Sequence, residues 1–138
     1  MQKDRNITIR TLGTLVICCQ NKNTAPDAEF AACWDVVRGN VHGATELRLL
    51  VITTGGGPTP NQRKMLEETL AGRALRTAIV SDSIKMRFII STMALFNPDI
   101  KMFTNREISA AYSFLSVEGP TRKKVEDIVQ DMTQQLTD

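Results

Sequence analysis

The sequence has little cysteine and almost no histidine, which excludes several kinds of site. Its 138 residues include three cysteines and one histidine. Cys18, Cys19 and Cys33 show neither the spacing of metal ligands nor the even number that a disulfide framework needs, so we interpret them as buried thiols. A single histidine, His42, excludes a metal site built on a histidine pair, and a catalytic triad would have to use this one turn residue. We expect no metal and no cofactor.

The chain also lacks an excess of one charge and any long apolar run. Seventeen basic and 15 acidic residues leave a net charge of +2, and the basic residues are scattered. Nucleic acids and anionic membranes are bound by clusters of lysine and arginine, so we expect neither partner. No apolar run approaches the roughly 18 to 20 residues that span a bilayer, and the first residues, MQKDRN, are polar. These features predict a cytoplasmic protein without a membrane anchor or secretion signal.

The most informative stretch is ELRLLVITTGGGPTPNQR, residues 46–63. Residues 47–52 form a nearly continuous apolar run, which is typical of a central strand buried on both faces of a sheet. The glycines and prolines that follow end the strand and predict a sharp turn into a helix at about residues 60–71. Ligands in open α/β sheets gather beyond the carboxyl ends of strands, so this glycine corner is the first candidate site.

The segments on either side alternate between strand and helix patterns. Strands are predicted at residues 7–12, 14–20, 76–80 and 100–103, and helices at 24–39, 84–96, 105–115 and 119–136. Thr24 and Ser83 are the expected N-caps of two of these helices, and Gly39 is the expected end of the first. The order predicts an α/β fold in which helices flank a mixed, mostly parallel sheet of about five strands joined by right-handed crossovers. With no linker or repeat, residues 1–138 are interpreted as one domain, with a core of about 5–116 and an extra C-terminal helix at about 119–136.

Three features carry a resemblance to a known family: the strand that ends in a polar and glycine-rich corner, the segment RTAIVSDS, and the segment FNPDIKMFTNREISAAYSFL. With the order of elements, they resemble the STAS superfamily, named for sulphate transporters and anti-sigma factor antagonists. The closest part is its branch of small stand-alone domains similar to the sporulation anti-sigma factor antagonist. The resemblance covers roughly residues 5–116 and implies a non-enzymatic regulatory or protein-interaction module with a STAS-like fold.

The chain departs from that family at one functional position. Family members that act as partner switches carry a phosphorylatable serine, in an Asp-Ser pair, at the start of the helix after the central strand. The matching corner here holds Thr53, Thr54 and glycines, and the one Asp-Ser pair, Asp82 with Ser83, lies one strand later. The resemblance therefore does not by itself imply a phosphorylation switch at Ser83.

The glycine corner and the end of the next strand form a candidate contact rim. It consists of Thr53, Thr54, Gly55, Gly56, Gly57, Thr59, Arg63, Asp82 and Ser83. Three interpretations stay open: a plain tight turn, contact with an anion or nucleotide through glycine N–H groups, and a phosphoacceptor at one of the threonines. The corner lacks the Lys-Ser/Thr ending of a P-loop and the GxGxxG spacing of a dinucleotide turn. A nucleotide, phosphate or lipid site here is the alternative to the interaction module.

The helix predicted at residues 84–96 is unusually apolar. Its apolar residues wrap well beyond the roughly 100° stripe of a surface helix. Either the helix is buried between the sheet and the C-terminal helix, or it presents a protein-contact face for a second copy or another protein. The residues expected to form that face are Ile84, Met86, Arg87, Phe88 and Ile90. No catalytic group of residues is apparent, so we expect no enzyme.

Overall fold

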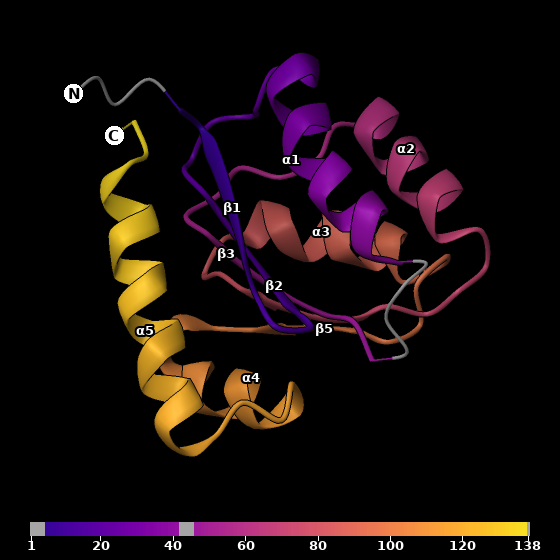
Figure 1. Cartoon of the computed structure of the whole chain (residues 1–138). Coiled ribbons are helices and arrows are strands. Elements are labelled where there is room, and N and C mark those ends of the chain that lie inside the picture. Colours follow the sequence, from indigo (N-terminus) through magenta and orange to yellow (C-terminus); the bar gives the residue numbers. More distant parts are fainter. Residues whose placement is uncertain (1–4, 42–45, 138) are drawn as a thin grey trace.

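The computed structural model describes residues 5–41 and 46–137, which form one sheet with helices on both of its faces (Figure 1). Within these residues the sheet has five strands in the order β1-β2-β3-β4-β5. The strands are β1 (Ile7–Leu12), β2 (Leu15–Gln20), β3 (Arg48–Thr53), β4 (Arg76–Val80) and β5 (Ile100–Phe103). Strands β1 and β2 are antiparallel, and β2 to β5 run parallel. The predicted mixed, mostly parallel α/β fold is confirmed.

Strand β3 occupies the middle of the sheet, as its apolar sequence predicts. It pairs with β2 on one side and with β4 on the other, and Leu50 lies between Ile17 and Ala78 in the register. All three of these side chains are fully buried. An apolar run with few polar interruptions fits this position because both faces of the strand are covered.

The helices are divided between the two faces of the sheet. The crossover helices α1 (Asp27–Val41), α2 (Pro60–Leu70) and α3 (Ile84–Met93) cover one face (Figure 1). The other face is covered by α4 (Ile108–Phe114) and α5 (Gly119–Gln134), and the short 3₁₀ helix η1 (Asn105–Glu107) leads into α4. Since each parallel connection steps to the next strand in the same direction with right-handed twist, all three crossover helices must lie on one face.

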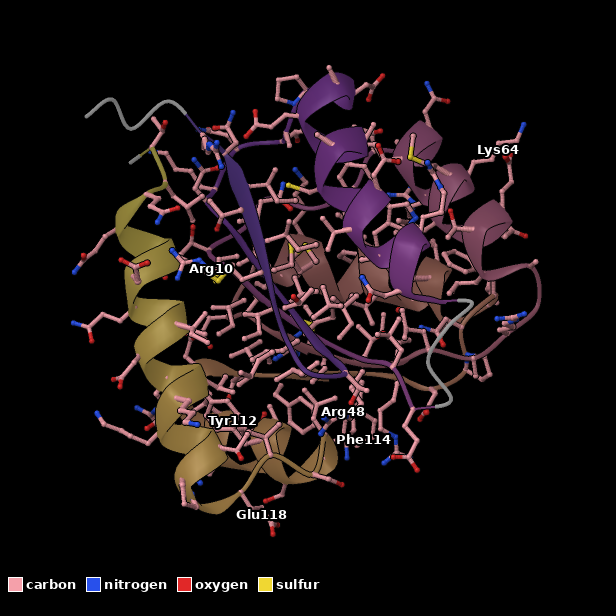
Figure 2. All side chains as sticks on the ribbon, in the orientation of Figure 1. Arg10, Arg48, Lys64, Tyr112, Phe114 and Glu118 are labelled. Carbon is pink, nitrogen blue, oxygen red and sulfur yellow. The ribbon has the colours of Figure 1, made fainter. Side chains whose placement is uncertain are left out.

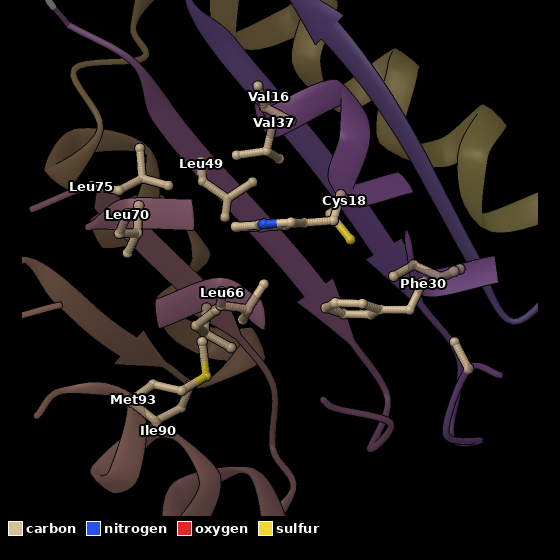
Figure 3. Packing of buried hydrophobic residues seen from close by; sticks show 14 of the residues in the cluster. Val16, Cys18, Phe30, Val37, Leu49, Leu66, Leu70, Leu75, Ile90 and Met93 are labelled. Carbon is tan, nitrogen blue, oxygen red and sulfur yellow. The ribbon is translucent and has the colours of Figure 1, made fainter. Parts of the chain in front are cut away.

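Each face has its own apolar core. The core under α1, α2 and α3 includes Phe30, Trp34, Leu66 and Met93, packed on side chains of β2 and β3 such as Cys18 (Figure 3). The core under α4 and α5 is built around Leu115, Val125 and Met132, among others. Both layers are close-packed on the same sheet, so the sheet is shielded from water on both sides.

The cysteines are thiols whose burial opposes ionisation. Cys18 and Cys19 are buried and belong to the cores on opposite faces of β2. Burial raises the pKa of Cys18 well above its usual value and the pKa of Cys19 to about 12. Cys33 is only half-buried, and burial again is the main cause of its raised pKa. A thiol that stays protonated is a poor nucleophile and a poor metal ligand.

The first helix differs from its predicted bounds. Thr24 is exposed and precedes the helix, which begins at Asp27. Because a proline disfavours helical backbone at the residue before it, Pro26 prevents Ala25 from joining the helix, and Thr24 is therefore not the N-cap. At the other end the helix runs through Gly39 to Val41.

Helix α3 is split between a buried side and an exposed side. Met86, Ile90 and Met93 face the sheet with at most 8% of their surface exposed. Ile84 and Phe88 are 72% and 73% exposed, and Leu95, just past the helix, is 87% exposed. The C-terminal helix α5 lies on the opposite face of the sheet, so the predicted burial of α3 between the sheet and that helix is wrong (Figure 1). Met86 and Ile90 are core residues and cannot belong to a contact face.

Alanine substitutions on the two sides of α3 should have opposite consequences for stability. We expect Met86→Ala to lower the free energy of unfolding by about 2 to 5 kcal/mol, because it leaves a cavity in the core. Phe88→Ala should change it by less than about 0.5 kcal/mol, because the side chain makes few contacts. Urea unfolding of both variants and the wild type checks this, and equal losses in the two variants would contradict the division of α3.

Candidate functional site

The glycine corner after β3 is folded onto itself and onto the loop that follows β2. Thr53 is buried, and its hydroxyl donates a hydrogen bond to the carbonyl oxygen of Gly56 (2.6 Å) while it accepts one from the N–H of Gly55 (3.1 Å). The N–H of Gly56 donates to the carbonyl oxygen of Asn21 (2.8 Å). Two of the three glycine N–H groups are therefore used inside the protein. An anion cradle needs such groups free, so the geometry favours the packed turn.

The lack of side chains at the corner serves close packing. A Cβ atom added at Gly56 would lie 2.2 Å from the carbonyl oxygen of Asn23 and 2.5 Å from that of Asn21. A Cβ atom at Gly57 would lie 2.6 Å from the sulfur of Met86. These distances are far below van der Waals contact, so a side chain at either position would overlap neighbouring atoms. The close approach of these segments therefore requires glycine at both positions.

The start of α2 holds Thr59 and Arg63 in local contacts. Thr59 is the N-cap: its hydroxyl accepts from the N–H of Gln62, whose side chain accepts from the N–H of Thr59. The Arg63 guanidinium donates to the carbonyl oxygen of Pro58 (2.9 Å). Gln62 is buried and its amide donates to the Ala25 carbonyl oxygen, at 2.9 Å. Gln62 thus links the glycine corner to the start of α1. The sequence did not predict this link, although T-x-x-Q is a capping-box pattern.

Asp82 and Ser83 lie at the end of the neighbouring strand, β4. The carboxylate of Asp82 accepts hydrogen bonds from the backbone N–H and the side-chain amide of Asn105, at 3.0 and 2.8 Å. The backbone hydrogen bond is the main reason why the pKa of Asp82 is lowered. Ser83 is the N-cap of α3, as predicted, because its hydroxyl accepts from the N–H of Met86. Asp82 therefore links the start of α3 to the start of η1.

The structure brings part of the predicted rim to one surface and buries the rest. A Cβ atom at Gly55 would lie 3.9 Å from the Ser83 hydroxyl oxygen, so the two strand ends do border each other. Thr53, Gly56 and Gly57 are buried and cannot contact a partner. The accessible part comprises Thr54 and Asp82, which are exposed, and Gly55, Thr59, Arg63 and Ser83, which are half-exposed.

Two hollows flank the exposed side of α3. An open groove of about 470 Å³ lies between α2 and α3, lined by Pro60, Arg63, Lys64, Glu67, Thr92, Leu95 and Phe96. A second hollow of about 280 Å³ lies on the other flank, where Arg87 and Ser91 of α3 approach Thr104 and Glu107. Ile84 and Phe88 lie one turn apart on the exposed side of α3, and the exposed Leu95 follows just past the end of that helix. We call these three residues the α3 ridge.

In the described part of the chain, the apolar cavity in the core is small. An apolar cavity of about 70 Å³ lies between the sheet and α1, α2 and α3, and Gly56, Gly57 and Pro58 line it at the glycine corner. Pockets that bind drug-sized molecules measure roughly 300 to 1,000 Å³. A nucleotide or an acyl chain would have to open the core before it could enter this space.

Two further findings concern the described part of the chain alone. No group of three or more histidine, cysteine, aspartate or glutamate side chains in residues 5–41 and 46–137 is placed to hold a metal ion. None of the helices in these ranges has both the length and the apolar character that crossing a membrane requires. His42, the one candidate for a catalytic histidine, lies outside the described residues.

Comparison with known proteins adds no relative. No protein-family model, no curated protein and no solved structure matches the chain. The resemblance to STAS domains thus stays a prediction from the sequence, and function has to be inferred from the surface chemistry of the chain itself.

Paired glycine substitutions test the packed corner. We expect Gly56→Ala to lower the free energy of unfolding by more than about 1 kcal/mol, because the added carbon overlaps two carbonyl oxygens of the neighbouring loop. Gly39→Ala is the control: it lies in helix α1 with open space around it, and alanine there should raise stability by about 0.5 to 1 kcal/mol. Urea unfolding measures both, and a neutral Gly56→Ala would contradict the packed turn.

The titration of Asp82 tests its link to Asn105. The pKa of Asp82 is lowered in the folded protein, so its ionised form adds stability above the unfolded-state pKa, and this is lost as the pH falls through the folded-state pKa. We expect carboxyl-detected NMR to show Asp82 titrating below the usual aspartate range. Asn105→Ala should move that pKa part of the way back, because the backbone N–H remains. Titration of Asp82 at its ordinary value in the wild type would contradict the link.

Proposed function

We propose that this chain is a non-enzymatic interaction module of STAS-like type, which binds a protein partner through the α3 ridge and the accessible rim beside it. The observation that carries the proposal is the distribution of exposed apolar side chains. Among the described residues, the strongly exposed large apolar side chains are Ile84, Phe88 and Leu95, and all three belong to the α3 ridge. Single exposed apolar residues are ordinary, but three large ones along one helix and the turn after it are a candidate association surface.

The polar surroundings of the ridge support the same function. Asp82 is exposed beside the N-terminal end of α3, and Ser83 is half-exposed there. Protein interfaces commonly combine a small apolar centre with a polar rim that stays in contact with water. The ridge with Asp82 and Ser83 has this composition, and no reactive side chain is needed for binding.

The regulatory part of the proposal depends on the family resemblance. The order of elements and the segments RTAIVSDS and FNPDIKMFTNREISAAYSFL are the features that resemble small stand-alone STAS domains. Such domains act by binding other proteins, and an exposed helix face beside the carboxyl ends of the strands agrees with that way of acting. A ligand site at the glycine corner has less support, because two of the three glycine N–H groups there are already used.

Site-specific crosslinking at the ridge tests the proposal. The photoreactive residue p-benzoylphenylalanine placed at position 88 should crosslink a discrete protein in the cells that naturally make this chain, and mass spectrometry identifies it. The same residue at position 121, which is exposed on α5 on the other side of the sheet, is the control and should give no such adduct.

Binding of the purified partner then measures the contribution of the ridge. We expect Phe88→Glu to weaken binding at least tenfold, because truncating or charging a central aromatic contact typically costs more than about 1 kcal/mol. Lys124→Glu, at an exposed helical position on α5, should leave binding unchanged. Absence of any adduct at position 88, or full binding by Phe88→Glu, would contradict the proposed function.

A further inference from the structure

The groove between α2 and α3 adds charge to the apolar surface of the ridge. Its α2 wall contains Arg63 and Lys64 together with Glu67, and its α3 wall contains Leu95 and Phe96. Lys64 projects outward from α2 (Figure 2). Among the described residues, neither Arg63 nor Lys64 is in an ion pair. The Arg63 guanidinium already donates to the Pro58 carbonyl oxygen, so the groove offers an apolar surface beside one exposed cation, Lys64, that is open to a partner's carboxylates.

Helix α3 is itself purely cationic. It carries Lys85 and Arg87 and no carboxylate, and both side chains are exposed. Neither is in an ion pair among the described residues. Arg87 faces Glu107 across the second hollow, so the cations left for a partner are those of the α2 wall and Lys85. An apolar strip bordered by unpaired cations is complementary to an apolar strip bordered by carboxylates.

We infer, building on the proposed interaction function, that the groove between α2 and α3 receives an acidic amphipathic helix of a partner protein. Its apolar side packs on Phe88, Leu95 and Phe96, and its carboxylates lie beside Lys64 and Lys85. On its α2 side the groove is lined from Pro60 to Glu67, about 10 Å of helix, and on the other side by Thr92 and two residues just past α3, so it matches about two helical turns. A groove between two helices is suited to a third helix that presents anchors at i, i+3, i+4 and i+7.

A second copy of the chain is a poorer occupant. In a two-fold symmetric dimer the same surface contacts itself, so α3 of one copy would lie on α3 of the other. Lys85 and Arg87 of both copies would then lie close together, since the carboxylates near the patch, such as Glu67 and Asp82, lie at its border and not on α3 itself. Like charges brought together at an interface are unfavourable, and an acidic partner avoids this cost.

A flat anionic membrane is also a poorer occupant. Glu67 lies in the groove and Asp82 lies at the N-terminal end of α3, so carboxylates border the patch at two places. An extended anionic surface would face both at once, whereas a helix can place its carboxylates beside the cations alone. The same carboxylates help to set the direction in which a helix lies.

A peptide library tests the charge and the shape of the occupant. The library displays 15-residue helical peptides with leucine, isoleucine or phenylalanine along one side and with glutamate or lysine allowed at the flanking positions. Selection against the full chain should enrich glutamate at the flanks. Fluorescence anisotropy should show that the best peptide binds more weakly as salt concentration rises, because salt screens the charges.

Charge-reversal variants then test which residues the peptide contacts. Leu95→Glu should weaken binding of the selected peptide at least tenfold, and circular dichroism should show that this exposed position leaves the fold intact. The double variant Lys64→Glu with Lys85→Glu should weaken the glutamate peptide at least tenfold and should prefer its lysine counterpart. Lys124→Glu on α5 is the matched control and should bind the glutamate peptide like the wild type.

Several results would overturn the inference and leave the proposed function standing. One is a selection that enriches peptides without favouring glutamate at the flanks. Another is a double variant that still prefers the glutamate peptide. A third is a wild-type dimer in sedimentation that Leu95→Glu dissociates. Saturable binding to vesicles of phosphatidylcholine and phosphatidylserine, lost in Leu95→Glu, would assign the surface to a membrane instead. If the inference fails but position 88 still crosslinks a protein, only the nature of the partner is wrong. If neither peptide nor adduct is found, both proposals fail.

Discussion

The direction of the crossovers constrains the rest of this structure. Each of the three connections between parallel strands from β2 to β5 leads to the adjacent strand in the same direction across the sheet, and each contains one helix. Right-handed crossovers that never reverse direction place α1, α2 and α3 on one face. Ligand crevices in open α/β sheets form where the strand order reverses, and β2 to β5 contain no reversal. The surface of the helix layer thus becomes the best candidate for function.

The glycine corner illustrates how a motif that suggests a ligand can serve packing instead. Gly56 fits between the carbonyl oxygens of Asn21 and Asn23, and Gly57 lies against Met86. The corner therefore joins three segments: the loop after β2, the start of α2 and the buried side of α3. Helix α3 is anchored through Met86, and this leaves its opposite side, with Ile84 and Phe88, exposed to solvent.

Local sequence signals predicted the elements well because their causes are local. The apolar run before the glycines gave the central strand, and Ser83 gave the start of α3. Thr24 is not the N-cap, because Pro26 keeps Ala25 out of the helical conformation. This local restriction outweighed the preference for threonine at N-cap positions. Element type and most element ends could therefore be predicted from residues a few positions apart.

The candidate site could be predicted only in part, because its properties depend on distant segments. The apolar pattern of α3 includes residues on every side, so it did not reveal that Met86 faces the sheet and Phe88 faces solvent. Met86 faces the sheet because α3 packs against it there, and the opposite side of α3 stays exposed because α5, which begins more than 20 residues later, covers the other face of the sheet. The hydrogen bond from the Asn105 N–H to the Asp82 carboxylate and the one from the Gln62 amide to the Ala25 carbonyl oxygen likewise join segments that no local pattern connects.

The central claim is that the α3 ridge is exposed in the free chain and covered when the chain acts. Hydroxyl-radical footprinting, read by mass spectrometry at each side chain, measures this directly in the purified chain and inside the cells that make it. The account predicts strong oxidation of Phe88 and Leu95 in the purified chain and clear protection of both in cells, while the buried Tyr112 stays protected in both. Equal oxidation of Phe88 and Leu95 in the two settings would contradict it.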